Sequence, residues 1–260
     1  MIDKDGLAGL ERMQELTLES NCLTEIKANT FQSLKLLKKL NLTRNRIRDV
    51  SPLAFEGLYS LIELNLDDNK IAHLKASTFK GLKKLQCLSL CRNRMKSLEK
   101  RSLVDLTSLR ELNMQVNKLN RIERASFESL GQLVKLNMRD NQIAYVDKNA
   151  FEGLVCLEEL NLRNNRMAKL ESSSVFEHLT RLRKLYLSLN EISSIGSSVF
   201  AGLCDLEELD FESNKLAKIR AKVFLEMKKL KKLNLKDNDI NLSDKSALVD
   251  GLGARVVLEF

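Results

Sequence analysis

The 260-residue sequence contains 43 lysines and arginines and 35 aspartates and glutamates, so its formal net charge is +8 at pH 7. Hydrophobic residues make up 43% of the chain and charged residues 30%, which is typical of a globular protein and excludes a disordered one. No apolar run approaches the roughly 18 residues of a membrane span, and the opening segment MIDKDGLAGLERMQEL lacks the apolar stretch of a secretory signal peptide.

Residues 1–12 precede the first complete unit of an internal repeat. Leu7 and Leu10 fit the second half of a unit whose first half is missing. We therefore expect these residues to form an incomplete N-terminal coil that packs on the repeats that follow.

Residues 13–240 consist of ten copies of one unit, LxxLxLxxNxLxxLxxxxFxxLxx. The copies, called coils one to ten, begin at Met13, Leu37, Leu61, Leu85, Leu109, Leu133, Leu157, Leu182, Leu206 and Leu230. Their spacing is 24 residues except between Leu157 and Leu182, where an extra serine in ESSSVF makes it 25. A fixed period of this length is the signature of a solenoid, in which each unit packs only on its neighbours. The whole chain is thus predicted to be one solenoid domain.

The start of each unit predicts a strand. In LKKLNLTRN, Leu40 and Leu42 alternate with polar residues, as expected for a strand with one buried face. Ten such strands would stack into a parallel sheet, with loops and short helices on the opposite, convex side.

Two further positions of the unit predict internal structure. The ninth position is asparagine in all ten coils, and an amide that both donates and accepts can satisfy backbone groups where the chain leaves the sheet. The nineteenth position is phenylalanine in eight coils, with Leu103 in its place once. Such a recurring ring predicts core packing between coils rather than a ligand pocket.

Residues 241–260 depart from the repeat. Ser243 and Asp244 predict the start of a short helix that runs through Asp250 and stops at Gly251, and ARVVLEF predicts one more strand. Neither end carries a polar cap of the kind that solenoids use to shield their last coil. We therefore expect a fragment or an incomplete gene product.

The 24-residue unit resembles the typical class of leucine-rich repeats, found mostly in animal cell-surface and secreted proteins, over Met13 to Ile240. LNLTRNRIRDVSPLAFEGLYSL and VFLEMKKLKKLNL are most similar to ectodomains of the leucine-rich-repeat and immunoglobulin-like family. The resemblance implies a curved, right-handed α/β solenoid with a concave parallel sheet that binds protein partners. Extracellular members usually bracket their repeats with cysteine-bearing caps, and this sequence departs from them by carrying none.

The five cysteines are predicted to be free thiols. Cys87 and Cys91 lie on one strand about 13 Å apart, beyond the roughly 7 Å that a disulfide allows between Cα atoms. Cys156 and Cys204 lie two coils apart, and Cys22 stands alone near the start. An odd, scattered set of this kind does not indicate a disulfide framework.

Catalytic, metal and cofactor sites are not predicted. The two histidines, His73 and His178, are more than a hundred residues apart and no CxxC pair accompanies them. The sequence has no GxSxG, no glycine-rich phosphate loop and no HExxH motif. We therefore predict a protein that is not an enzyme and that binds no cofactor.

Residues at the same position of successive units form columns along the predicted sheet. The third column alternates in sign: Glu15, Lys39, Glu63, Cys87, Glu111, Lys135, Glu159, Lys184, Glu208 and Lys232. The fifth column is mostly asparagine, and the tenth carries six cations: Arg46, Lys70, Arg94, Lys118, Arg166 and Lys215. The third column is expected to neutralise itself through neighbouring pairs, whereas the tenth has no such balance.

Exceptions to these columns locate the predicted partner site. Tyr186 occupies the fifth column and Leu189 the eighth, so both are expected to be exposed on an otherwise polar sheet. Tyrosine is enriched at binding hot spots. Val116 would extend the patch towards coil five. Three cations lie one and two coils away: Arg139, Arg163 and Arg166. The expected partner is a protein that presents an apolar side chain flanked by acids.

Two functions from different classes remain open: the ligand-binding region of a cell-surface or secreted receptor, and an intracellular interaction scaffold. The basic strip keeps an anionic glycan, lipid or nucleic acid open as less favoured ligands. Nucleic acid is disfavoured further, because Tyr59, Tyr145 and Tyr186 are too scattered to stack bases. The glycosylation sequons at Asn41 and Asn241 would matter only in a secreted chain. The sequence gives no indication of whether the chain is a monomer or an oligomer.

Overall fold

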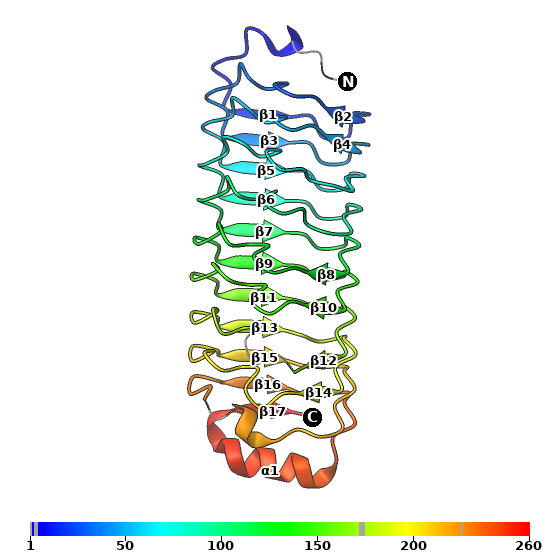
Figure 1. The fold of residues 1–260 in the computed structure, drawn as a ribbon, viewed down its shortest axis with the longest axis vertical. Coiled ribbons are helices and arrows are strands. Elements are labelled where there is room, and N and C mark those ends of the chain that lie inside the picture. Colours follow the sequence, from blue (N-terminus) through cyan, green and yellow to red (C-terminus); the bar gives the residue numbers. More distant parts are fainter. Residues whose placement is uncertain (1, 3–4, 172–174, 225) are drawn as a thin grey trace.

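The computed structural model describes residues 2, 5–171, 175–224 and 226–260. Figure 1 shows a single elongated stack of coils, with the N-terminus at one end and helix α1 at the other. The extra serine of ESSSVF lies outside the described residues. The repeat register nevertheless continues across it, because Glu159 pairs with Lys184 and Leu160 with Leu185.

Each coil contributes one short strand to an eleven-stranded parallel sheet. In every strand the central residue points into the core and its two neighbours point to the other face, as the alternation in the sequence predicts. Residues at the same position of successive repeats pair with each other across neighbouring strands, as Glu15 does with Lys39. In sheet order the strands are β1 (Glu15–Thr17), β3 (Lys39–Asn41), β5 (Glu63–Asn65), β6 (Cys87–Ser89), β7 (Glu111–Asn113), β9 (Lys135–Asn137), β11 (Glu159–Asn161), β13 (Lys184–Tyr186), β15 (Glu208–Asp210), β16 (Lys232–Asn234) and β17 (Val257–Glu259). The predicted solenoid with a parallel sheet is confirmed.

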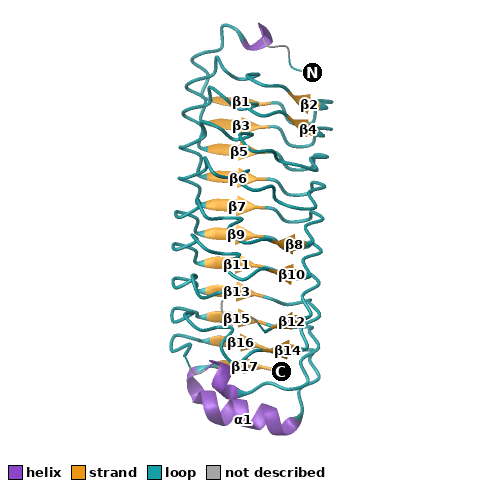
Figure 2. Ribbon diagram, viewed as in Figure 1, coloured by secondary structure: helices purple, strands orange, loops and turns teal. Residues whose placement is uncertain are grey.

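Away from the sheet the chain runs mostly through turns, with little helix (Figure 2). Three two-stranded parallel ladders also form there: β2 (Glu25–Ile26) with β4 (Asp49–Val50), β8 (Arg121–Ile122) with β10 (Tyr145–Val146), and β12 (Lys169–Leu170) with β14 (Ser194–Ile195). Short 3-10 helices occur at Asp5–Leu7 and Ala221–Phe224.

The C-terminal helix α1 (Leu242–Leu252) begins earlier and ends later than predicted. Asn241, not Ser243, caps it, because the Asn241 side chain accepts the backbone N–H of Asp244 at 2.8 Å. Gly253, with φ +62°, ends it in place of Gly251. The helix buries Leu248 and Leu252. A 3-10 turn at Gly253–Arg255 then leads into β17, the predicted final strand.

Phenylalanines of the nineteenth column stack along the core. Phe31, Phe55 and Phe79 lie with ring centroids 6.0 and 5.8 Å apart in nearly parallel planes. A second stack runs from Phe127 through Phe151, Phe176 and Phe200 to Phe224. Leu103 is buried between the two stacks and interrupts them. The prediction that these rings fill the core between coils is confirmed.

The ninth-column asparagines form the predicted ladder. The side-chain oxygen of Asn141 accepts the backbone N–H of Leu119 in the preceding coil at 3.0 Å. Its amide nitrogen donates to the carbonyl oxygens of Met114 and Met138, both at 3.0 Å. The same pattern repeats at Asn45, Asn69, Asn93, Asn117, Asn165, Asn190 and Asn214, all buried. Buried backbone groups that lack a regular partner are thereby satisfied.

Candidate binding site on the sheet face

The solvent-facing side chains of the eleven-stranded sheet form a surface called the sheet face below. Its third column contains the expected ion pairs: Lys39 lies 3.5 Å from Glu15 and 3.9 Å from Glu63, and Lys135 lies 3.2 Å from Glu111. Towards the C-terminal end the partners change. Lys232 instead contacts Glu259 of β17 at 3.2 Å, and Glu208 contacts Tyr186.

The fifth-column asparagines stabilise the turn that follows each strand, a task that the sequence analysis missed. The side-chain oxygen of Asn137 accepts the backbone N–H of Arg139 at 3.1 Å, and that of Asn161 accepts the N–H of Arg163 at 3.0 Å. Asp210 does the same for Glu212 at 3.0 Å. The recurrence of one amide along the sheet is therefore explained by local hydrogen bonding. The sequence did contain a sign of this role, because an asparagine commonly accepts the backbone N–H of the residue two positions later in a turn.

The eighth column holds its residues in the left-handed backbone region in all ten coils, with φ between +53° and +57°. This conformation suits glycine, asparagine and aspartate, and it is strained for a β-branched residue. Val116 and Leu189 nevertheless occupy it, at φ +54° each, and are 36% and 39% exposed. Both predicted apolar exceptions thus lie on the surface in a backbone conformation that does not favour them.

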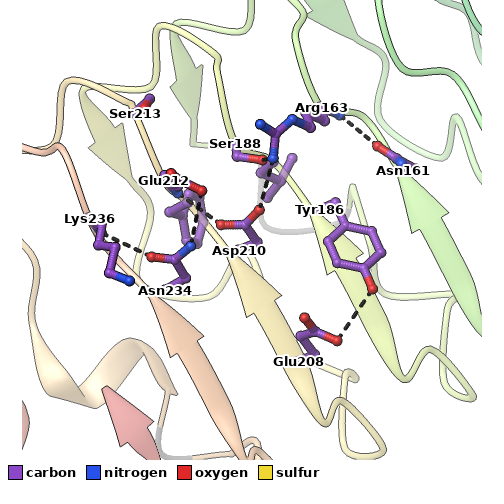
Figure 3. Close-up of polar contacts among 12 residues, drawn as sticks. Asn161, Arg163, Tyr186, Ser188, Glu208, Asp210, Glu212, Ser213, Asn234 and Lys236 are labelled. Atoms are coloured by element: carbon purple, nitrogen blue, oxygen red, sulfur yellow. Dashed lines mark hydrogen bonds and ion pairs between the residues drawn. The ribbon is translucent and has the colours of Figure 1, made fainter. Parts of the chain in front are cut away.

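Tyr186 lies on β13 and is half-buried, not exposed as expected from its column. Its hydroxyl donates to a carboxylate oxygen of Glu208 on the next strand at 3.3 Å (Figure 3). Burial, with the nearby negative charges of Glu208 and Glu159, raises the pKa of Tyr186 to about 12. The hydroxyl therefore stays protonated at neutral pH, and the immediate surroundings of the ring are acidic.

Two of the three predicted arginines already contact acids of their own chain. Arg163 reaches across coil eight: one terminal nitrogen donates to the Ser188 hydroxyl at 3.3 Å and lies 4.0 Å from a carboxylate oxygen of Asp210. Figure 3 shows this network beside Tyr186. Arg139 pairs with Asp140 at 3.1 Å. Arg166 is exposed, and within the described residues no carboxylate lies within 4.0 Å of it.

Tyr186, Leu189 and Arg163 are brought together on coils seven and eight, but Val116 is not. Two polar residues of the eighth column, Asp140 and Asn164, lie between Val116 and Leu189, and the Asn164 amide donates to Asp140 at 2.7 Å. The three steps between coils amount to roughly 14 Å. The expectation that Val116 extends the apolar patch is therefore wrong.

A hollow of about 450 Å³ lies over β5, β6, β7 and β9, another feature that the sequence analysis did not identify. Cys87 and Ser89 line it, and both are smaller than the lysine or glutamate and the asparagine that most other coils carry in these columns. Burial, with the nearby carboxylates of Glu111 and Glu63, raises the pKa of the Cys87 thiol. The thiol therefore stays protonated and weakly reactive at neutral pH.

Comparison with known proteins agrees with this architecture. The sequence matches the family described as "Leucine rich repeat" over residues 11–71, 60–119, 111–167 and 180–240. A 58-residue segment is 43% identical to the leucine-rich repeat-containing G-protein coupled receptor 5 of Rattus norvegicus. That segment covers 22% of this chain and only 6% of the receptor.

Solved structures share the fold along nearly the whole chain. A leucine-rich repeat protein of Leptospira interrogans is 26% identical with a TM-score of 0.70, over 96% of this chain and 67% of that one. A chain from an octameric complex of Latrophilin 3, Unc5D and the leucine-rich repeats of FLRT2 is 22% identical with a TM-score of 0.73, over 95% and 83%. The plant peptide hormone receptor RGFR1, in complex with RGF2, is 23% identical with a TM-score of 0.68, over 90% and 37%.

Repeat domains of this kind are generally protein-interaction modules and are typically non-enzymatic. None of the helices in the described residues has the length and apolar character to cross a membrane. The register of the coils, the asparagine ladder and the match over four stretches of sequence lead to one identification. The chain belongs to the leucine-rich repeat family.

Proposed function

We propose that the chain is the partner-binding repeat region of a cell-surface or secreted receptor-like protein, and that a protein partner lies on its sheet face. The similar proteins named above support this proposal. One is a G-protein coupled receptor, one is the FLRT2 repeat region in a complex with Latrophilin 3 and Unc5D, and one is a peptide hormone receptor bound to RGF2.

The observation that carries the site assignment is the pair Tyr186 and Leu189 on coil eight. Leu189 keeps an apolar side chain exposed at φ +54°, where a polar residue would be less strained and better solvated. Tyr186 is held in place by Glu208. An aromatic ring that is already ordered loses little conformational entropy on binding, so this pair is suited to be the centre of an interface.

The surrounding charges suggest what the partner presents. An apolar side chain would pack against Leu189 and the Tyr186 ring. Arg166, which is exposed, and Arg139, whose pair with Asp140 lies at the surface, would face carboxylates of the partner. Glu159 and Glu208 would face a donor or a cation on the other side of the ring. The partner surface expected here therefore carries both signs of charge around an apolar knob.

An intracellular interaction scaffold is the second candidate, favoured by the five free thiols. Proteins of oxidising compartments usually pair their cysteines, whereas proteins of reducing compartments keep them as thiols. This candidate uses the same sheet face and differs in the compartment of the partner.

The test is a double substitution, Tyr186→Ser with Leu189→Ser. The immobilised chain is used to capture partners from cell-surface and cytosolic extracts in parallel, and the affinity of each captured protein is then measured by calorimetry. We expect the double variant to weaken binding by about 2 kcal/mol or more, roughly 30-fold, with the fold retained, as circular dichroism would verify.

The matched control is Tyr59→Ser with Val155→Ser, because these are an exposed tyrosine and an exposed aliphatic residue away from the sheet face. It should leave the affinity unchanged. Wild-type affinity of the Tyr186/Leu189 variant, or equal loss in both variants, contradicts the site. Partners captured only from the cytosolic extract favour the scaffold over the receptor.

A further inference from the structure

The positive charge of the molecule is concentrated on one flank. This flank, called the basic flank below, consists of columns eight, ten, twelve and thirteen of coils two to five, which follow each sheet strand. It carries nine cations, Arg44, Arg46, Arg48, Lys70, Arg92, Arg94, Lys96, Lys118 and Arg121, against two acids, Asp49 and Asp68. None of these residues is buried. The same columns of coils six to ten carry four cations and four acids, so their charges cancel.

The tenth column forms the centre of the flank. The backbone N–H of Lys70 donates to Ile47 of the preceding coil at 2.8 Å, and the N–H groups of Arg94 and Lys118 donate in the same way to Ile71 and Met95. These bonds hold Arg46, Lys70, Arg94 and Lys118 as consecutive neighbours at roughly 4.8 Å per coil. They make a straight row of cations about 14 Å long, parallel to the long axis of the stack.

The row is not neutralised by the chain itself. Arg44, Arg92 and Arg121 pair with Glu19, Asp68 and Glu123. Across the described residues, by contrast, no carboxylate lies within 4.0 Å of Arg46, Arg48, Lys70, Arg94, Lys96 or Lys118. Like charges at this spacing repel one another, as they do when they lie directly opposite on paired strands. The third column of this molecule avoids that by alternating its signs at the same spacing, whereas the tenth column retains the repulsion, which a bound anion would relieve.

We propose that the basic flank binds a linear sulfated polysaccharide along the tenth column. A sulfate ester is permanently charged and offers several acceptor oxygens to arginine and lysine donors. A chain of such groups matches a straight row of cations. A peptide partner would need an apolar anchor, and the flank offers only Val116. A membrane surface would need inserted apolar residues besides charge. A single-stranded nucleic acid would need several aromatic stacking platforms, and in coils two to five these columns carry no phenylalanine, tyrosine or tryptophan and a single histidine, His73.

The experiment measures binding of a size-fractionated heparin oligosaccharide to the full chain by calorimetry over a series of NaCl concentrations. The test variant is Lys70→Gln with Arg94→Gln. We expect its Kd to rise about tenfold or more at low salt. Because two cations no longer displace counterions, the slope of log Kd against log [NaCl] should fall by roughly 1.5 to 2. The variant Lys70→Arg, which preserves the positive charge, should bind as tightly as the wild type.

The matched control is Lys215→Gln with Lys218→Gln, which removes the same charge from columns ten and thirteen of coil nine. It should change Kd less than about twofold. An equal loss in both double variants would mean that only net charge matters, and it would overturn the assigned row. The proposal is also overturned if unsulfated hyaluronan, polythymidine or vesicles containing phosphatidylserine bind as tightly as heparin. The Tyr186/Leu189 variant should bind heparin normally, which separates this proposal from the sheet-face one.

Discussion

At the scale of single residues, amide side chains connect the coils more than the charged pairs of the sheet do. The ninth-column asparagines from Asn45 to Asn214 are buried and join segments of backbone from neighbouring coils, whereas the ion pairs of the third column lie at the surface, where they contribute little. The fifth-column asparagines add a second, exposed set of side-chain to backbone bonds. Most turns after the sheet strands are therefore stabilised by uncharged amide side chains, with Asp210 in this role in coil nine.

Replacing Asn141 with alanine should lower the free energy of unfolding by about 1–3 kcal/mol, because the Leu119 N–H loses its partner in a buried site and the Met114 and Met138 carbonyl groups each lose one of two donors. Urea denaturation measures the change. Glu111→Ala, which removes only a surface ion pair with Lys135, is the control and should have a clearly smaller effect. Equal effects of the two substitutions would contradict the role assigned to the ladder.

Val116→Asn should stabilise the chain by roughly 1 kcal/mol. The position has φ +54°, where a β-branched side chain is strained and asparagine is tolerated. Thermal melting of the variant measures the gain. Val155→Asn, at an exposed valine outside the left-handed region, is the control and should give no gain. A lower melting temperature for the Val116 variant would show that its side chain contributes packing that outweighs the strain.

At the scale of structural elements, most neighbouring coils are joined by the stacking of one phenylalanine ring on the next. Phe151 lies between Phe127 and Phe176, with centroids 6.2 and 5.9 Å away. Leu103 occupies the same column elsewhere and is fully accommodated. The column therefore requires a large apolar side chain and does not require an aromatic one.

Phe151→Ala should lower the free energy of unfolding by about 3–5 kcal/mol, since it leaves a cavity between two coils. Phe151→Leu should cost about 1 kcal/mol, because Leu103 shows that the backbone of a coil closes around leucine. Urea denaturation of the two variants compares them directly. Similar losses in both would mean that the aromatic stack itself, and not filled volume, holds neighbouring coils together.

At the scale of the whole molecule, stability is distributed over many similar interfaces between neighbouring coils. The buried residues form one continuous core from Leu7 to Val256, and all five cysteines are free. No covalent link between coils is therefore needed to hold the stack, and each coil depends on its two neighbours.

Thiol titration in denaturant without reductant should count five thiols per chain, because Cys22, Cys87, Cys91, Cys156 and Cys204 all lack a partner sulfur in the fold. Titration after reduction is the control and should give the same number. A count of three or fewer for the isolated monomer would indicate an intramolecular bridge that the register does not allow.

The sequence alone determined the repeat, the buried columns and the asparagine ladder. Leucines and phenylalanines that recur every 24 residues can be buried only if the coils stack in register, so periodicity specifies which column faces the core. The repeat also identified Tyr186 and Leu189 as an aromatic and an apolar residue at positions where most other coils carry polar residues.

Only the tertiary structure decided how side chains meet between coils. Tyr186 is half-buried against Glu208, and Arg163 reaches over Ser188 to Asp210. The tertiary structure also shows that Asp140 and Asn164 lie between Val116 and Leu189 in the eighth column. The physical reason is that the position of a residue in the repeat decides which face of the coil its side chain lies on. It does not decide in which direction a long side chain extends along that face. The contacts between coils join residues more than twenty positions apart in the sequence. Which neighbour a long side chain can reach depends on the size of the side chains that lie in its path.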